Sequence, residues 1–142
     1  MQTTQEATEG LLRFGHVQEY DASRHMARVI FPAMNGIISG WLPVLVSFTN
    51  GNKSESHLDI GSHVACIMAG EGAELGVILG TFYDDTNAPG TGNADITSLT
   101  FPDGTEIAYD RASHSLSVNC AGSITMKATG DIKIQGANIW LN

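Results

Sequence analysis

The chain has 142 residues, of which 42% are hydrophobic, and its fifteen acidic and seven basic side chains give a formal net charge of −8. A chain of this size can form one ordinary core, or one small domain with an appendage, but not a large multidomain enzyme. The acidic balance argues against a nucleic-acid partner, because such binding rests largely on Lys and Arg. The start MQTTQEATEG lacks the pattern of an export signal, and no window holds the roughly 20 apolar residues of a membrane span.

Sixteen glycines and abundant Thr, Ser, Val and Ile favour short strands and tight turns, so an all-β fold is expected. A polar N-terminal segment, residues 1–12, precedes a dense alternating stretch at residues 13–86 that turn sequences divide into five runs. The five expected strands lie near residues 13–20, 25–32, 40–48, 62–70 and 75–83, and the last two are apolar enough to be buried on both faces. Five such strands fit a closed five-stranded OB-fold barrel, and a generic β-sandwich is the alternative.

Residues 87–98 form the expected linker. They belong to a stretch rich in Asn, Asp, Gly and Thr that carries almost nothing apolar to anchor it. Beyond the linker, Leu99 and Phe101 alternate with polar residues, and Ile107 and Tyr109 do the same after Pro102-Asp103-Gly104. Since this tripeptide is a strong turn sequence, a β-hairpin is expected here.

An eight-residue repeat follows the hairpin. Residues 115–138 divide into SLSVNCAG, SITMKATG and DIKIQGAN, with large apolar residues at the second and fourth positions of each octet and a small residue at the sixth. The eighth position is Gly122, Gly130 or Asn138, and these residue types enter positive-φ turns at least cost.

A single chain cannot bury the apolar stripe that these octets create. Three copies wound around a threefold axis could bury it, so residues 99–142 are predicted to form a trimeric intertwined β-prism, or β-helix. The predicted trimer core consists of Leu116, Val118, Cys120, Ile124, Met126, Ala128, Ile132 and Ile134. The residues predicted to face solvent are Ser117, Asn119, Thr125, Lys127, Lys133 and Gln135.

The sequence offers no recognisable catalytic or metal site, so neither an enzyme nor a cofactor is expected. The five histidines are dispersed without ligand spacing, at His16, His25, His57, His63 and His114. Strand alternation would place Glu19 and Asp21 on the face opposite His16, which is poor geometry for a shared proton. Asp84 and Asp85 lack the spacing of a calcium loop and are interpreted as part of a solvated linker. Cys66 and Cys120 are expected to be reduced and packed.

Several stretches resemble the baseplate assembly protein V family, which forms the central spike of contractile-tailed bacteriophages and has relatives in the valine-glycine repeat spikes of type VI secretion. Arg13 to Val17 is similar to the Arg-x-Gly-x-Val opening strand of that family, Trp41 to Pro43 to its Trp-Leu-Pro, and Gly76 to Tyr83 to its last barrel strand. The FPDGTEIAYD hairpin and the octets look like the start of its trimeric β-helix. The resemblance covers residues 11 to about 138.

The resemblance implies a structural central spike of a phage baseplate, or of a related injection particle. Such a homotrimer would dock to hub proteins and the tail tube, help to penetrate the host envelope through transient contact, and reside in the virion tail after assembly in the host cytoplasm. Many family members end in a His-x-His pair that binds iron, but this sequence contains no such pair, so no metal is carried over. The alternative function is a soluble OB-type binding module that its C-terminal repeat trimerises.

The last residues break the octet pattern, because Ile139 and Leu141 make the final turn apolar on both faces around Trp140. In a trimer, Ile139, Trp140 and Leu141 would form an apolar end, and such exposed patches usually mark interfaces. We interpret this end as a platform for a separate tip protein; the alternative is a hydrophobic plug that closes the rod.

Overall fold

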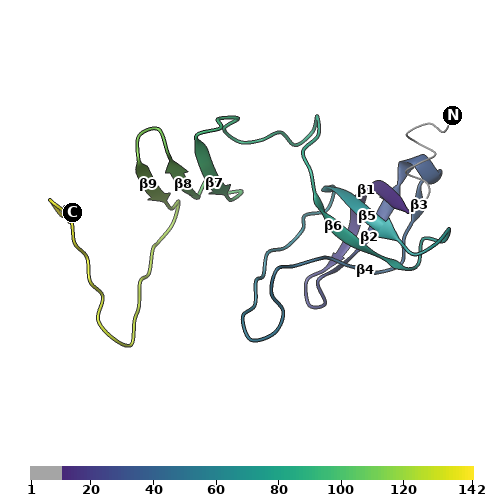
Figure 1. Cartoon of the computed structure of the whole chain (residues 1–142), viewed down its shortest axis with the longest axis horizontal. Coiled ribbons are helices and arrows are strands. Elements are labelled where there is room, and N and C mark those ends of the chain that lie inside the picture. Colours follow the sequence, from purple (N-terminus) through teal and green to yellow (C-terminus); the bar gives the residue numbers. More distant parts are fainter. Residues whose placement is uncertain (1–10) are drawn as a thin grey trace. The chain divides into compact units, whose positions relative to one another are not determined.

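The computed structural model describes residues 11–142, and within them the protein is all-β apart from a single short 3-10 helix (Figure 1). The predicted all-β class is therefore confirmed. The chain divides into a first compact unit that ends at Ala88 and a second that runs from Pro89 to Asn142. No helix among the described residues is long and apolar enough to cross a membrane.

The first unit is one six-stranded antiparallel sheet. Its elements are β1 (Leu12–Asp21), β2 (Met26–Phe31), the 3-10 helix η1 (Pro32–Met34), β3 (Ile37–Ile38), β4 (Leu42–Pro43), β5 (His63–Met68) and β6 (Gly76–Thr81). The strand order is β3-β2-β1-β5-β6, and β4 also pairs with β2. Register shifts between Val17 and Glu19 and between Ala65 and Cys66 mark irregularities of the β-bulge type, which bend a sheet and increase its twist.

The bent sheet brings its two ends together beside β4. Val44 forms an isolated parallel bridge with Ile78 of β6, and the Leu45 N–H donates to the Ile78 carbonyl at 3.1 Å. The Val44 N–H donates to the His25 carbonyl at 3.1 Å. The segment after β4 therefore links β6 to the turn between β1 and β2.

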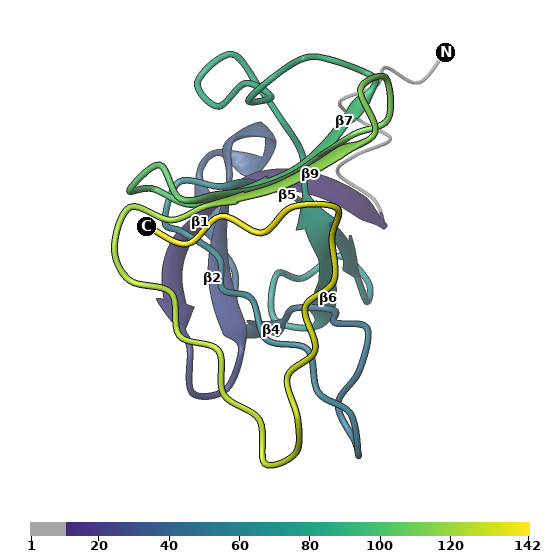
Figure 2. The same ribbon diagram turned by 90° about the vertical axis from the view of Figure 1, so that its left-hand side faces the viewer.

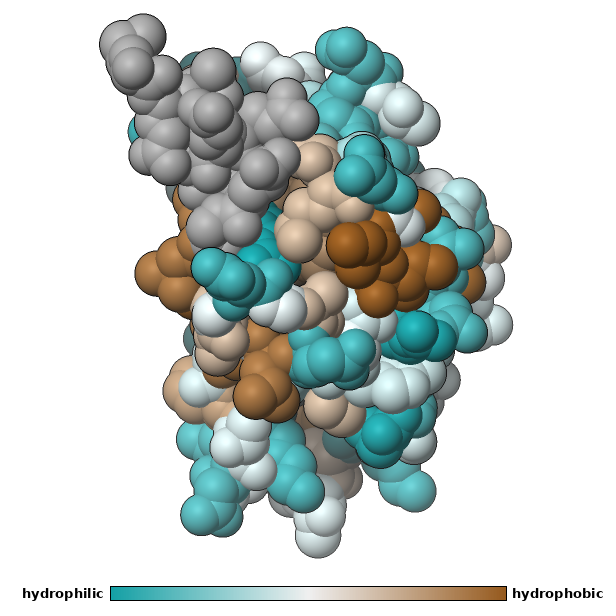
Figure 3. All heavy atoms as spheres, turned by 90° about the vertical axis from the view of Figure 1, so that its right-hand side faces the viewer, coloured by the Kyte–Doolittle hydropathy of each residue, from teal (hydrophilic) through white to brown (hydrophobic). Residues whose placement is uncertain are grey.

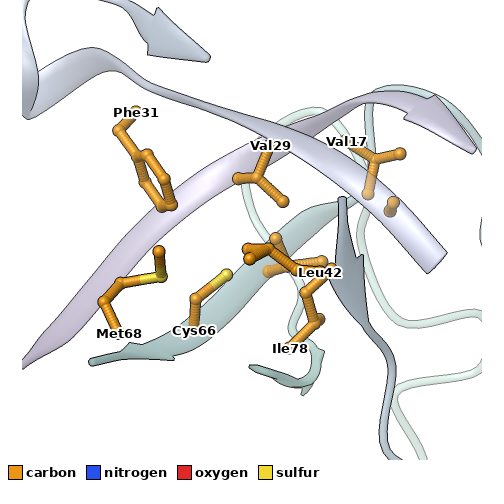
Figure 4. Packing of buried hydrophobic residues seen from close by; sticks show 9 residues of the cluster. Val17, Val29, Phe31, Leu42, Cys66, Met68 and Ile78 are labelled. Atoms are coloured by element: carbon orange, nitrogen blue, oxygen red, sulfur yellow. The ribbon is translucent and has the colours of Figure 1, made fainter. Parts of the chain in front are cut away.

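A compact apolar core lies inside this curved sheet, and alternate residues of β2 and β5 supply most of it. In Figure 4 the side chains from β1 and β2 point toward those of β4, β5 and β6. The core consists of Val17, Ala27, Val29, Phe31, Leu42, Val64, Cys66, Met68 and Ile78. Cys66 is a free thiol, packed as expected, and its burial raises the pKa of the thiol to about 12, so it stays protonated and unreactive at neutral pH.

Arg13 is also fully buried, and it holds the loop between β5 and β6. Its guanidinium donates to the carbonyls of Gly70, Glu71 and Gly72 at 2.9, 3.2 and 3.0 Å. One side chain thereby fixes three consecutive loop carbonyls, which matches the fork of donors that only Arg presents.

Two strand predictions were wrong in detail. The strand expected at residues 40–48 shrinks to Leu42–Pro43, and a further short strand, β3, precedes it. Pro43 has no N–H to extend a ladder, and the amides that follow it bond to His25 and Ile78 instead. The strands expected to be buried on both faces are covered on one face only, since Ile67 and Leu79 are 37% and 42% exposed. Apolar side chains consequently remain on the surface of the molecule (Figure 3).

Gly15 lies on β1 with no room for a side chain on the side of β2. A Cβ added there would lie 2.3 Å from the Ile30 carbonyl oxygen and 2.5 Å from Val29 Cγ1, so the backbones would have to separate. We expect Gly15→Ala to lower the free energy of unfolding by about 1–3 kcal/mol, the usual cost of overpacking. Chemical denaturation of the full chain measures this change.

Gly72→Ala is the matched control for Gly15→Ala. No atom lies within 4 Å of the position that its Cβ would occupy, so its effect should stay within about 0.5 kcal/mol. Equal effects of the two substitutions would contradict the close approach of β1 and β2.

Candidate functional site

The second unit begins with a three-stranded antiparallel meander of β7 (Ile96–Thr100), β8 (Glu106–Asp110) and β9 (Ser115–Asn119). The hairpin predicted around Pro102-Asp103-Gly104 is confirmed. Gly104 has a φ of 89°, and the Asp103 carboxylate accepts the Thr105 N–H at 2.9 Å, a contact that lowers the pKa of Asp103. Ile96 to Ser98, expected in the linker, pair with β8 instead.

One face of this meander is apolar and uncovered. Leu99, Ile107 and Val118 lie directly opposite one another across the three strands, and Tyr109 lies opposite Leu116 in the next row. Directly opposed residues share a face of a sheet, so the five side chains form one continuous surface. They are between 42% and 69% exposed, which is unusual for a cluster of this size in a monomer.

Beyond β9 the chain continues without pairing. Figures 1 and 2 draw residues 120–142 as a plain coil that runs away from the meander and turns back. Within the described part of the chain, no backbone–backbone hydrogen bond involves residues 120–142. The strands expected in the second and third octets are therefore absent from a single chain, because no neighbouring strand is there to complete them.

The predicted core positions of the octets are mostly exposed in the single chain. Leu116 and Val118 lie on β9, Cys120 is half-buried just after it, and Ala128 is exposed in the unpaired segment. The four large apolar residues of the later octets are 50–70% exposed, namely Ile124, Met126, Ile132 and Ile134. The final residues Ile139, Trp140 and Leu141 are 52%, 88% and 92% exposed. One chain alone therefore does not gather these residues into a core.

The glycines of the repeat do not adopt the left-handed backbone that their residue type allows. Gly122 and Gly130 do not have a positive φ, and no atom of the chain lies within 4 Å of the Cβ that either would carry. The expectation of positive-φ turns at these positions was wrong. Nothing within the single chain requires glycine there.

Two carboxylates of β1, Glu19 and Asp21, form ion pairs with neighbouring arginines. Glu19 pairs with Arg28 at 2.9 Å, and Asp21 accepts hydrogen bonds from Ser23 and Arg24 that lower its pKa to about 2. A carboxyl with so low a pKa cannot serve as a general acid at neutral pH. The register shift between Val17 and Glu19 puts both carboxylates on the same face as His16, so the expectation of opposite faces was wrong.

Four of the five histidines, which the sequence shows as dispersed, form two pairs in the first unit, and His114 lies in the second unit. His16 of β1 lies directly opposite His63 of β5 with ring centroids 4.3 Å apart, and His25 and His57 both contact the Tyr20 hydroxyl, at 2.6 and 2.7 Å. The available signal was the pair Gly-His-Val and Ser-His-Val, in which alternation puts each valine in the core and each histidine on the opposite face.

Comparison with known proteins gives one distant relationship. No model of a known protein family matches the chain. The spike protein of Escherichia phage P2 is 23% identical to it over 126 residues, which make up 89% of this chain. The chain is a distant homologue of that spike protein. It spans 58% of the length of the phage P2 spike protein. The resemblance that the sequence motifs suggested is thereby confirmed.

Proposed function

We propose that the protein is the trimeric central spike of a contractile phage tail baseplate or a related injection particle. The first unit docks to hub proteins and the tail tube, and the second unit forms an intertwined β-prism that helps to penetrate the host envelope. The observation that carries this proposal is the unpaired, alternating apolar segment at residues 120–142. Homology to the phage P2 spike protein supports the same role and a place in the virion tail.

The unpaired backbone argues for association with copies of the same chain. Extended segments leave N–H and C=O groups on both edges, and structures rarely leave such groups without partners. Three copies wound about one axis would pair each other's strands and cover each other's apolar positions. Each large apolar side chain buried in this way contributes roughly 1.5–3 kcal/mol, and the octets supply six per chain.

The glycines and small residues of the repeat fit the same arrangement. Neither the backbone conformation nor a steric contact within one chain requires glycine at Gly122 and Gly130. The close approach of a neighbouring chain would require it. Cys120 and Ala128, at the sixth positions, are small enough for strands to come near the threefold axis.

Of the two folds considered for the first unit, its strand pairing favours the closed OB-type barrel and not the β-sandwich. Its strands form one continuous bent sheet, whereas a sandwich needs two sheets packed face to face. The bridge from Val44 to Ile78 joins the segment after β4 to β6, where such a barrel would close. A barrel with its own core can dock as a preformed body, while the prism requires three chains.

A chain that ends at Ala88 should be monomeric, whereas the full chain should be a trimer. Residues up to Ala88 contain the complete apolar core of the first unit, and the uncovered stripe lies wholly beyond it. Sedimentation equilibrium of both chains measures the difference. A tight trimer from the shortened chain would contradict the assignment of assembly to residues 99–142.

Ile132→Asp should abolish the trimer. It would set three carboxylates close together in an apolar interior, where burying one unpaired charge already costs several kcal/mol. Lys133→Asp, one position along on the predicted outward face, is the matched control and should leave the trimer intact. The mass of each variant in solution is the measurement, and equal tolerance of both would mean that the phase of the repeat is reversed.

Electron microscopy of the native particle tests the function as a whole. We expect three copies of the chain on the axis of the baseplate, with separate density for a tip protein on the apolar end around Trp140. Trp140→Ala should remove that density and leave the spike in place, because the indole is 88% exposed and contributes little to a single chain. Absence of the chain from the baseplate would refute the spike role. Tip density that survives the substitution would favour the hydrophobic plug.

A further inference from the structure

The surface of the first unit carries a pair of stacked imidazoles. His16 and His63 are directly opposed on β1 and β5, and both point away from the core because the valines that follow them point into it. Their rings are 4.3 Å apart at an angle of 23°. Phe82 lies 4.0 Å from the His63 ring, so contacts with both His16 and Phe82 restrict the orientation of this imidazole.

A carboxylate faces the same pair. Asp84 follows β6, and its Oδ1 accepts the N–H groups of Thr86 and Asn87 at 2.9 and 2.8 Å. Its Oδ2 lies 3.2 Å from His63 Nδ1. The turn thus fixes one carboxylate oxygen and leaves the other directed at the imidazole. One ligand atom each from His16, His63 and Asp84 lie within 4.8 Å of one another.

Each of the two imidazoles has a ring nitrogen that could bind a ligand. His63 Nδ1 is fully covered, and the polar atom that faces it is Asp84 Oδ2 at 3.2 Å, in a geometry too poor for a good hydrogen bond. His16 Nδ1 lies 3.3 Å from the Gly61 carbonyl, which can only accept, so the tautomer that fits this contact has its proton on Nδ1 and its lone pair on Nε2. A backbone bond of this kind is the usual support for a metal-bound histidine.

We propose that His16, His63 and Asp84 form a binding site for a divalent transition metal, with Zn²⁺ as the best fit. Two imidazoles and one carboxylate suit such ions, whereas Ca²⁺ prefers an all-oxygen shell of six to eight ligands. Bonds of roughly 2.0–2.2 Å around tetrahedral zinc put ligand atoms about 3.4 Å apart, so binding requires the two imidazoles to turn out of their stacked arrangement and bring the three ligand atoms closer together. A hollow of about 610 Å³ lies beside His63.

The position of the site suggests what a bound ion would do. Asp84 lies just before the end of the first unit at Ala88, whereas His16 and His63 lie in the middle of the sheet. A metal held by all three would tie the outgoing chain to β1 and β5. This role does not depend on the proposed trimer, because all three ligands come from the first unit of one chain.

The test is titration of the untagged full chain with Co²⁺ and with Zn²⁺. We expect saturable binding of one ion per chain, visible Co²⁺ absorption that Zn²⁺ displaces, and a higher thermal midpoint with Zn²⁺ because ligands of the native state stabilise it. His63→Phe keeps a ring between His16 and Phe82 but removes the ligand. Asp84→Asn keeps an oxygen for Thr86 and Asn87 but removes the charge. Each should weaken binding by at least about tenfold, since even groups behind the ligands account for 10- to 100-fold.

Two controls locate the ion. Asp103→Asn changes a turn carboxylate of the second unit that accepts a backbone N–H as Asp84 does. His57→Phe removes one imidazole of the other histidine pair. Both variants should bind the metal ion like the unaltered chain. Absence of saturable binding by the unaltered chain would overturn the proposal. So would affinity that falls in His57→Phe but not in His63→Phe, and so would full affinity in a His63→Phe chain whose circular dichroism is native.

Discussion

Backbone hydrogen bonding is the constraint on which the second unit depends. Residues 120–142 lie outside the strands of the single chain and make no backbone–backbone hydrogen bond among the described residues, so most of their N–H and C=O groups must bond to water or to another chain. Water alone would give no reason for apolar residues to recur at fixed positions of an octet, or for glycine at Gly122 and Gly130. The partner strands of the proposed trimer would explain both patterns, because they would satisfy the backbone and cover the alternating apolar side chains together. The uncovered face of β7, β8 and β9 continues the same surface into the part of the chain that does pair with itself.

The first unit differs from the second, because it pairs its strands and buries its apolar core within one chain. Gly15 lets β1 approach β2, the irregularities in β1 and at the β5–β6 pairing allow the sheet to bend, and Arg13 holds the loop that leads into β6. A long-range antiparallel sheet of this kind forms slowly compared with a helical bundle, but it does not wait for other chains. We therefore expect folding of the first unit to be unimolecular, whereas the proposed assembly of the second unit would depend on chain concentration.

The sequence predicted those features that local patterns determine. Alternation identified the strands that became β1, β2, β5 and β6, and the Pro102-Asp103-Gly104 turn identified the hairpin. It could not predict that β4 would shorten to two residues, because that depends on where the Val44 and Leu45 amides find acceptors in distant strands. Nor could it bring together His16 and His63, which are 47 positions apart in the chain and meet only through the register of β1 and β5. Ile124 and Ile132 alternate with polar residues as core residues do, yet they are 61% and 50% exposed in the single chain.

The junction between the units is fixed at both of its ends by a carboxylate. Asp84 closes the turn after β6 and faces His63, while Asp95 pairs with Arg111 at 2.7 Å and its carbonyl accepts the Arg111 N–H at 3.0 Å. The chain between these two aspartates can span at most about 36–40 Å if fully extended. Each aspartate thus holds its end of the junction against the sheet of its own unit, and these contacts leave the residues between the two aspartates unrestrained. A metal on His16, His63 and Asp84 would strengthen the first of these ties, and the Asp95–Arg111 pair, exposed to solvent, would remain the weaker one.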